Sequence, residues 1–434
     1  MFSQEWIEHR GLIKAIRRSN PDAVIVGGGE HPTSIPEFIL RDCPEIDYIV
    51  MGEGEITFLE LCYRIFHDKN TRDVGGTSFL DDNGTYVFNG LSNRIAHINE
   101  IPRPAWHLIN VENYFIDNWS MGISMGRNMP ILATRGCPYQ CTFCSSPSMW
   151  TTRYTMRTTT EVVDEIEFLI EQYQANSIDF FDLTAIVKRD WILAFCAELK
   201  KRNINITWQL PSGTRSEALD QETLQEIYDT GCKLLVYAPE SGSAETLSKI
   251  KKKLKLPRLI DSVSHAAAIG HTIKLNFIIG FPHERYRNVF QTIWTVFILA
   301  LKGASDCHIA IFAPYPGSEL YDELRKEGKI ERPNDQYFKG LFVIFDYTVL
   351  KSYCRHISAP PLLILRLFGM MIFYVVAYAS HPRRLIRIIR SVQKERFQAG
   401  NLIEQRIFDI IVRRRITAQK DKVETANVVK LPQK

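Results

Sequence analysis

The first 95 residues alternate apolar runs of helical spacing with short apolar runs typical of buried strands. The expected elements are a helix at 6–18, a strand at 23–26, a helix at 35–42, a strand at 48–50, a helix at 57–67 and a hairpin at 79–88 with its turn at Asp82-Asn83-Gly84. Strands that alternate with helices predict a parallel, doubly wound sheet. Residues 96–129 are broken by prolines and glycines and are expected to form a connector.

From residue 130 the alternation becomes regular, with six apolar runs that are each followed by a helical pattern. The expected strands are 131–134, 177–181, 206–210, 233–237, 273–279 and 307–312, and the helices between and after them are 160–173, 190–202, 216–229, 244–269, 288–301 and 319–327. Right-handed parallel crossovers then predict an α/β core over 130–330, a partial (β/α)6 barrel. Chemistry is expected at the carboxyl ends of its strands.

Residues 331–434 are expected to be mostly helical, with an apolar stretch at 362–379 and a basic tail. From His381 onward there are 14 Lys and Arg against 5 Asp and Glu, so the tail carries +9 of a net charge of only +4. The stretch allows a buried core helix, a helix lying on a membrane surface with arginines toward lipid headgroups, or a membrane span. A span fits least well, because the core and the basic tail both belong on the cytoplasmic side.

Composition is that of a globular protein, since 45% of the 434 residues are hydrophobic and 24% are charged. The first residues lack the basic start and apolar run of a secretory signal. Six of the nine cysteines are scattered without a disulfide framework. Reduced thiols and a cytoplasmic location are therefore expected, with membrane association through the C-terminal region as one alternative.

Three cysteines fall within eight residues, as Cys137, Cys141 and Cys144 in the spacing C-x3-C-x2-C. Three thiolates on one loop can bind three irons of a 4Fe–4S cluster and leave the fourth open to a small molecule. A structural zinc site needs a fourth protein ligand, and no Cys or His lies at suitable spacing. A disulfide would leave one cysteine over, so the cluster is the favoured interpretation.

This cysteine motif resembles that of the radical S-adenosylmethionine (radical SAM) enzymes. The resemblance implies that S-adenosylmethionine chelates the open iron and is cleaved by an electron from the cluster to a 5′-deoxyadenosyl radical. It also implies an electron donor such as flavodoxin or ferredoxin and a small-molecule substrate.

Later segments resemble the same family at the ends of the expected strands. The resemblance implies contacts to S-adenosylmethionine from Phe143 beside the cluster, Asp182, Arg215, Glu240 and Ser241 in an "ESGS" loop, and Gly280 in a "GxPxE"-type turn. Pro314-Tyr315-Pro316-Gly317-Ser318 resembles the family's ending of the barrel. Three of these residues have a simpler alternative, which is a helix cap for Asp182, a surface salt bridge for Arg215 and a tight turn for Gly280.

The N-terminal piece is similar to the second half of the cobalamin-binding domain that precedes the barrel in one radical SAM subgroup. The matching residues, candidates for cobalamin contact, are Gly27, Gly28, Gly29, His31, Gly52, Glu53 and Gly54. Such a domain needs about five strands, and only two are expected here before the hairpin. The early strands and the loop with a lower histidine ligand are missing, so this domain is expected to be incomplete and cobalamin binding stays open.

Within the subgroup, Cys144-Ser145-Ser146-Pro147 followed by Arg153-Tyr154 most resembles the anaerobic magnesium-protoporphyrin monomethyl ester cyclases. The first hypothesis is therefore radical chemistry of cyclase or oxidoreductase type on an apolar or tetrapyrrole-like substrate. A cobalamin-dependent C-methyltransferase is the alternative, and a non-catalytic iron–sulfur or zinc protein is the alternative from another class. Nucleic acid is not expected as a partner, because no second cysteine trio and no added RNA-binding barrel is evident.

Overall fold

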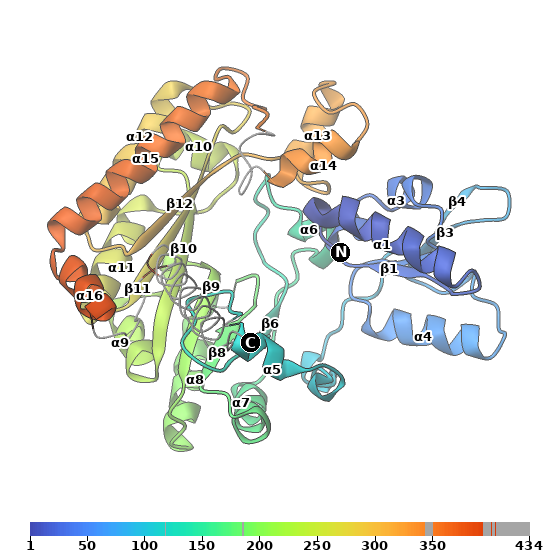
Figure 1. The fold of residues 1–434 in the computed structure, drawn as a ribbon, viewed down its shortest axis with the longest axis horizontal. Helices are drawn as coiled ribbons and strands as arrows, with labels where there is room; N and C mark the ends of the chain where they lie inside the picture. Colours follow the sequence, from blue (N-terminus) through green and yellow to red (C-terminus); the bar gives the residue numbers. More distant parts are fainter. Residues whose placement is uncertain (118, 185, 343–349, 394–400, 402–403, 405–434) are drawn as a thin grey trace, which may run out of the picture.

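The computed structural model describes the chain except residues 118, 185, 343–349, 394–400, 402–403 and 405–434 (Figure 1). The basic tail after Glu404 therefore lies outside the described residues. The described part holds a small N-terminal sheet, a larger sheet with helices outside it, and C-terminal helices that return to both (Figure 1).

The larger sheet confirms the expected six-unit partial barrel. Its strands have the order β12-β11-β10-β9-β8-β5 and every neighbouring pair is parallel. They are β5 (Asn128–Ile131), β8 (Ser177–Phe180), β9 (Thr207–Thr214), β10 (Cys232–Glu240), β11 (Thr272–Ile279) and β12 (Asp306–Ile311). β5 and β12 are the two edges and do not pair in the described structure, so the barrel stays open.

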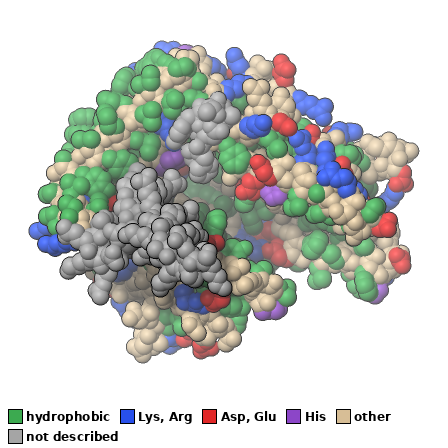
Figure 2. All heavy atoms as spheres, in the orientation of Figure 1, with side chains coloured by type: hydrophobic (Ala, Val, Ile, Leu, Met, Phe, Trp, Pro, Cys, Tyr) green, Lys and Arg blue, Asp and Glu red, His purple; other side chains and the backbone are tan. Residues whose placement is uncertain are grey.

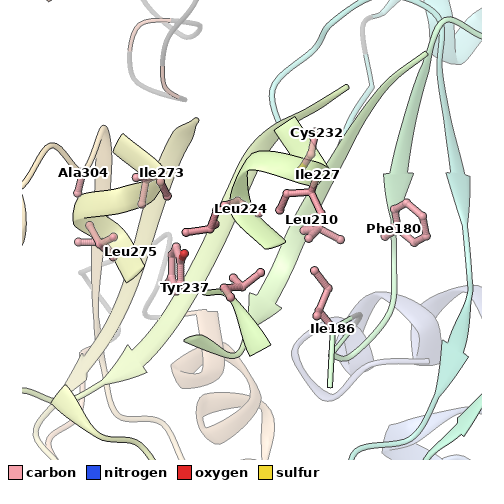
Figure 3. Packing of buried hydrophobic residues seen from close by; sticks show 14 of the residues in the cluster. Phe180, Ile186, Leu210, Leu224, Ile227, Cys232, Tyr237, Ile273, Leu275 and Ala304 are labelled. Atoms are coloured by element: carbon pink, nitrogen blue, oxygen red, sulfur yellow. The ribbon is translucent and has the colours of Figure 1, made fainter. Parts of the chain in front are cut away.

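The helices that cover this sheet follow their strands in the expected alternation. They are α7 (Thr159–Tyr173), α8 (Arg189–Lys201), α9 (Gln221–Asp229), α10 (Ala244–Lys249), α11 (Leu256–Ile269), α12 (Tyr286–Leu301) and α13 (Glu319–Lys326). Apolar side chains from neighbouring strands, such as Phe180, Leu210 and Tyr237, pack with Leu224 and Ile227 of α9 (Figure 3). Burial of one face of each element stabilises the barrel.

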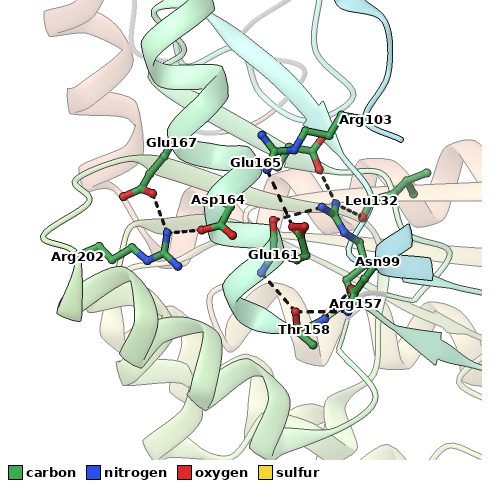
Figure 4. A network of polar contacts seen from close by, with 10 residues as sticks. All are labelled: Asn99, Arg103, Leu132, Arg157, Thr158, Glu161, Asp164, Glu165, Glu167 and Arg202. Carbon is green, nitrogen blue, oxygen red and sulfur yellow. Dashed lines mark hydrogen bonds and ion pairs between the residues drawn. The ribbon is translucent and has the colours of Figure 1, made fainter. Parts of the chain in front are cut away.

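Helix α7 is fixed to its surroundings by ion pairs on two sides (Figure 4). Arg202 bridges Asp164 at 2.5 Å and Glu167 at 2.7 Å, which ties the end of α8 to α7. On the other side Arg157 pairs with Glu165 and donates to the carbonyl of Leu132. Arg157 follows directly on β7 (Thr155–Met156), so α7 holds the strand that pairs with β6 (Thr134–Arg135).

The N-terminal sheet has the order β1-β2-β3-β4, with β1 (Val26–Gly28) parallel to β2 (Tyr48–Val50) and the hairpin β3 (Thr77–Leu80) and β4 (Tyr86–Phe88) antiparallel. Its helices are α1 (Trp6–Ser19), α2 (Glu30–Ser34), α3 (Pro36–Asp42) and α4 (Glu55–Phe66). The two parallel strands before the hairpin confirm the half-size sheet. The position of the first strand was wrong, because the glycines rather than residues 23–25 pair with β2.

The chain after β12 packs against both sheets. Phe338 of α14 (Asp335–Leu341) shares one apolar core with Trp6 of α1 and Phe281 at the end of β11. Two helices follow, α15 (Ala359–Ser380) and α16 (Arg383–Gln393). α15 is long and apolar enough to cross a membrane by length and composition alone, with mean hydropathy 2.1 and a third of that window buried. It lies against α12 and β12 by one face, which differs from a fully buried core helix (Figure 1).

Candidate functional site

The cysteine loop lies between β6 and α6 (Ser146–Trp150), at the carboxyl end of the first barrel strand. The backbone of Thr142 holds the loop on two sides, because its N–H donates to Ile250 and its carbonyl accepts from the N–H of Leu320, at 3.1 and 2.9 Å. Gly136 has φ +81°, and a Cβ there would lie 2.2 Å from the carbonyl oxygen of Arg153. The loop is therefore anchored by backbone hydrogen bonds from two distant segments, and Gly136 passes close to the backbone of Arg153.

Gly136→Ala is expected to lower the free energy of unfolding by about 3 kcal/mol and to reduce iron loading, since both the backbone conformation and the contact with Arg153 resist a side chain. Urea denaturation and iron analysis measure the two effects. Gly84→Ala is the matched control, because Gly84 also has positive φ (+75°) but no atom within 4 Å of its Cβ position. It is expected to cost about 1 kcal/mol without change in iron. Equal losses in both variants would contradict this account.

All three cysteines of the loop are free thiols that are partly buried. Burial raises the pKa of Cys141, and raises that of Cys144 to about 11 although the Ser146 hydroxyl lies 3.3 Å away. Among the described residues no three His, Cys, Asp or Glu side chains lie close enough to hold one metal ion. This does not conflict with a cluster, since each cysteine binds a different iron and the sulfurs stand farther apart. The donor set therefore fits a 4Fe–4S cluster.

Arg215, at the end of β9, faces the cysteine loop. Its guanidinium lies 3.9 Å from the ring centroid of Tyr139, donates to the carbonyl of Lys253 and pairs with Glu217 at 3.2 Å. Its Nε is buried without a hydrogen-bond partner. A buried donor without a partner is costly, so this group fits an acceptor such as the carboxylate of S-adenosylmethionine.

Glu240, at the end of β10, lies in the same corner. It has φ +66° and pairs with Lys252 at 3.0 Å, and both side chains are only 10% exposed. Burial acts to lower the pKa of Lys252, but Glu240 and the Cys141 thiol outweigh it and the pKa is raised. After burial, the charges with the largest effect on the pKa of Cys141 are Lys252, which lowers it, and Glu240, which raises it. This corner therefore places a compensated ion pair beside the cysteine loop.

Phe143 of the cysteine loop packs beside the turn that contains Gly280. Phe143 packs on Phe281 with ring centroids 5.7 Å apart. The turn at Gly280 has φ +85° and is closed by Glu284, which accepts from the N–H of Gly280 at 2.6 Å and of Phe281 at 3.2 Å. Burial raises the pKa of Glu284 to about 7. A Cβ on Gly280 would come within 2.8 Å of Leu362 in α15.

Asp182 and Ser241 are buried within the scaffold. Asp182 accepts from the hydroxyl of Thr134 at 2.5 Å and from the N–H of Ala133 at 3.2 Å, and burial raises its pKa to about 6. It fixes the chain just before the cysteine loop. The helix-cap alternative was wrong, since Lys188 is the N-cap of α8. Ser241 lies 3.0 Å from the Thr292 hydroxyl and accepts from the N–H of Ser243, so it closes its own loop.

The glycines of the N-terminal piece line a groove of about 450 Å³ at the carboxyl ends of β1 and β2. The glycines among its walls are Gly27, Gly28, Gly29, Gly52 and Gly54. Ligands of parallel sheets bind at this edge, and glycines in the wall let a flat or extended group approach the backbone. The groove therefore fits part of a corrinoid.

Met149 and Trp150 of α6 complete this groove. Since α6 begins at the cysteine loop, one short helix joins the two candidate sites. The Ser145 hydroxyl donates to Glu30 of α2 at 2.6 Å, which pins the cysteine loop to the β1–α2 turn. Both candidate sites therefore meet where the N-terminal sheet covers the end of the barrel.

Two of the sequence candidates are engaged elsewhere. His31 is buried with Nδ1 2.8 Å from the Ser3 hydroxyl, and burial lowers its pKa to about 3. It does not line the groove. Glu53 borders the groove, but its carboxylate accepts from the N–H of Ile95 and faces Arg94 at 3.3 Å and Arg135 at 3.8 Å. It joins the N-terminal piece to the strand that carries the cysteine loop.

Sequence reasoning missed Lys252, Tyr139 and the two arginines at Glu53. Lys252 stands in a run of lysines, which is typical of a solvated surface. Lys252 is buried because it lies in the connection between α10 and α11, where the chain direction turns its side chain inward. The Tyr139 contact was predictable in part, because Tyr139 lies inside the motif.

Comparison with known proteins agrees with this geometry. The radical SAM superfamily model matches residues 131–293, and the B12 binding domain model matches residues 4–62. An uncharacterized methyltransferase of Pyrococcus horikoshii is 29% identical over 311 residues, 72% of this chain and 65% of that protein. The anaerobic magnesium-protoporphyrin IX monomethyl ester cyclase of Rubrivivax gelatinosus is 27% identical over 319 residues, 72% of this chain and 55% of that protein.

A solved structure shows the same fold. The radical S-adenosylmethionine methyltransferase TsrM from Kitasatospora setae, with cobalamin and a [4Fe-4S] cluster bound, aligns with TM-score 0.62 at 20% identity over 77% of this chain and 66% of that one. This chain thus spans about half to two thirds of the length of these relatives. The cofactors of the two matched domains are a 4Fe–4S cluster with S-adenosylmethionine, and cobalamin. The matches place a B12-binding domain ahead of a radical SAM domain in this chain.

Proposed function

We propose that this chain is a cobalamin-dependent radical SAM methyltransferase that acts on an apolar small molecule. The observation that carries the proposal is the adjacency of the two sites, since α6 starts at the cysteine loop and ends in the wall of the glycine groove. Methyl transfer needs both cofactors close to one substrate, whereas cleavage of S-adenosylmethionine alone needs only the cysteine loop. The methyltransferase of P. horikoshii supports the same choice.

Each group of site residues has a separate role in this proposal. Cys137, Cys141 and Cys144 ligate the cluster, and the glycine groove holds the corrinoid. Arg215 and Glu240 orient the amino acid part of S-adenosylmethionine, while Phe143 and Phe281 keep water from one side of it. When bound, the cluster supplies an electron for cleavage and cobalamin supplies a carrier for a methyl group. A reductant of flavodoxin or ferredoxin type is part of the proposal.

An apolar pocket supports the substrate class. It has a volume of about 270 Å³, lies between the connector and β5, and is lined in part by Ile101, Trp106, Leu132 and Phe181. Arg135, which directly precedes Gly136 of the cysteine loop, is also part of its wall. An apolar ligand in this pocket would therefore contact the residue that leads into the cysteine loop.

The test uses anaerobically reconstituted protein with hydroxocobalamin, dithionite, S-adenosylmethionine with a deuterated methyl group and a membrane lipid extract. The expected result is 5′-deoxyadenosine, S-adenosylhomocysteine and a deuterated lipid product. Formation of 5′-deoxyadenosine with no transfer of label would favour the second candidate, a cyclase, which the R. gelatinosus relative supports. A protein that binds iron but cleaves no S-adenosylmethionine would overturn both.

A further inference from the structure

Two neighbouring helices on one side of the molecule expose apolar side chains at helical spacing. On α12 the exposed positions are Tyr286, Phe290, Trp294 and Leu301, and on α15 they are Ile364, Leu367, Phe368, Met371 and Val375. Trp294 is 63% exposed and Val375 is 62% exposed. Because α12 and α15 pack against each other, the two stripes form one continuous apolar face (Figure 2, upper left). Patches of this kind mark interaction surfaces.

The inner face of α15 is buried against the barrel. Leu362, Phe373 and Ala377 are buried, and Gly369 lets the helix approach β12 so closely that a Cβ would lie 2.7 Å from Ile309. α15 is therefore held along the barrel and is not free to cross a bilayer. The exposed apolar side chains on the outer face of α15 remain available to a flat partner surface.

The charged residues on these helices indicate which kind of partner surface is complementary to them. The residues of α12, α15 and α16 include six arginines and no aspartate or glutamate, although Arg366 is buried and Arg287 pairs with Glu245 at 2.7 Å. On α16, Leu385, Ile386 and Ile389 are exposed on a helix that also exposes Arg383 and Arg390. An exposed apolar face flanked by arginines is the pattern of a helix that lies in the interface of an anionic bilayer.

Two contacts place α16 beside the end of α12. Arg384 donates to the carbonyls of Gly303 and Ala304, just after α12, at 2.6 and 2.8 Å. Arg387 pairs with Glu404 at 2.8 Å. These contacts fix α16 at the end of the α12–α15 face and leave Arg383 and Arg390 exposed.

We propose that α12, α15 and α16 form a docking face for an anionic lipid surface, with the helices lying in the plane of the membrane. Trp294 and Tyr286 suit the headgroup region, where aromatic side chains with a polar edge are enriched. The inference does not depend on methyl transfer, because it rests on the outer side chains of these helices alone.

The test is flotation of the full-length protein with vesicles of phosphatidylcholine alone or with 30% phosphatidylglycerol. The wild-type protein is expected to float with the anionic vesicles, less so at high salt. Arg383→Gln with Arg390→Gln is expected to weaken binding about 30-fold. Trp294→Ser with Val375→Ser is expected to abolish flotation without loss of folded protein, since both positions are exposed.

Leu59→Ser with Phe66→Ser is the matched control. Both side chains are exposed on α4 (Phe66 is 84% exposed), which carries Glu55 and Glu60 and one arginine, Arg64, that pairs with Glu60. This variant is expected to float like the wild type. Failure of the wild type to float would overturn the proposal. So would a dimer that Trp294→Ser with Val375→Ser converts to monomer without change in flotation, because the face would then bind a second copy.

Discussion

Replacing Cys141 with alanine is expected to leave the protein unable to assemble its cluster. Wild-type protein reconstituted anaerobically should hold about four irons per chain, and the variant only background iron. The reason is that three thiolates within eight residues are the only cluster ligands the loop offers. Iron and sulfide analysis, with visible absorption of the reconstituted protein, measures the effect.

Cys62→Ala separates ligand loss from general loss of a thiol. Cys62 is a free, exposed cysteine on α4, outside the loop, and its replacement is expected to leave the iron content unchanged. Circular dichroism of both apo variants checks that they fold. Full iron content in folded Cys141→Ala would contradict the ligand assignment.

Lys252→Met is expected to lower the free energy of unfolding by about 3–5 kcal/mol, because it leaves the carboxylate of Glu240 buried without its partner. The pair is 3.0 Å apart and each side chain is 10% exposed. Urea denaturation of the apo protein measures the loss. The double variant Lys252→Met with Glu240→Gln is expected to recover most of it, since no unpaired charge remains.

Lys251→Met is the matched control for this prediction. Lys251 makes the same kind of ion pair with Glu319 at 2.6 Å, but both side chains are more than half exposed. Exposed pairs contribute little, so a loss below about 1 kcal/mol is expected. If both lysine variants lost the same free energy of unfolding, burial would not explain the contribution of the Lys252–Glu240 pair to stability.

The barrel was predictable because short segments rich in apolar residues alternate with helical patterns, which is typical of a parallel sheet with helices outside it. The first strand of the N-terminal sheet was placed too early for a physical reason. Val24 is apolar but 48% exposed, whereas Gly27 and Gly28 pair with Ile49 and Val50. Backbone hydrogen bonding sets the register of β1 against β2, and the pattern of apolar side chains does not reveal that register.

The candidate site was predictable where residues follow each other in a motif, and only in part elsewhere. The cysteine loop and the turns at Glu240 and Gly280 lie near one another at the barrel end, as their positions after strands predict. His31 could not be placed, because its contact with Ser3 depends on how α1 folds back over the sheet. Lys252 could not be found, because only packing distinguishes it from the lysines beside it.

The anchoring of Thr142 has a consequence for how the protein is made. Its two backbone partners, Ile250 and Leu320, leave the ribosome long after the cysteines themselves. The loop therefore reaches its final shape only when most of the chain has been synthesised. Iron–sulfur carriers should accordingly deliver their cargo to a nearly complete polypeptide, and chains stalled before Leu320 should remain poor acceptors.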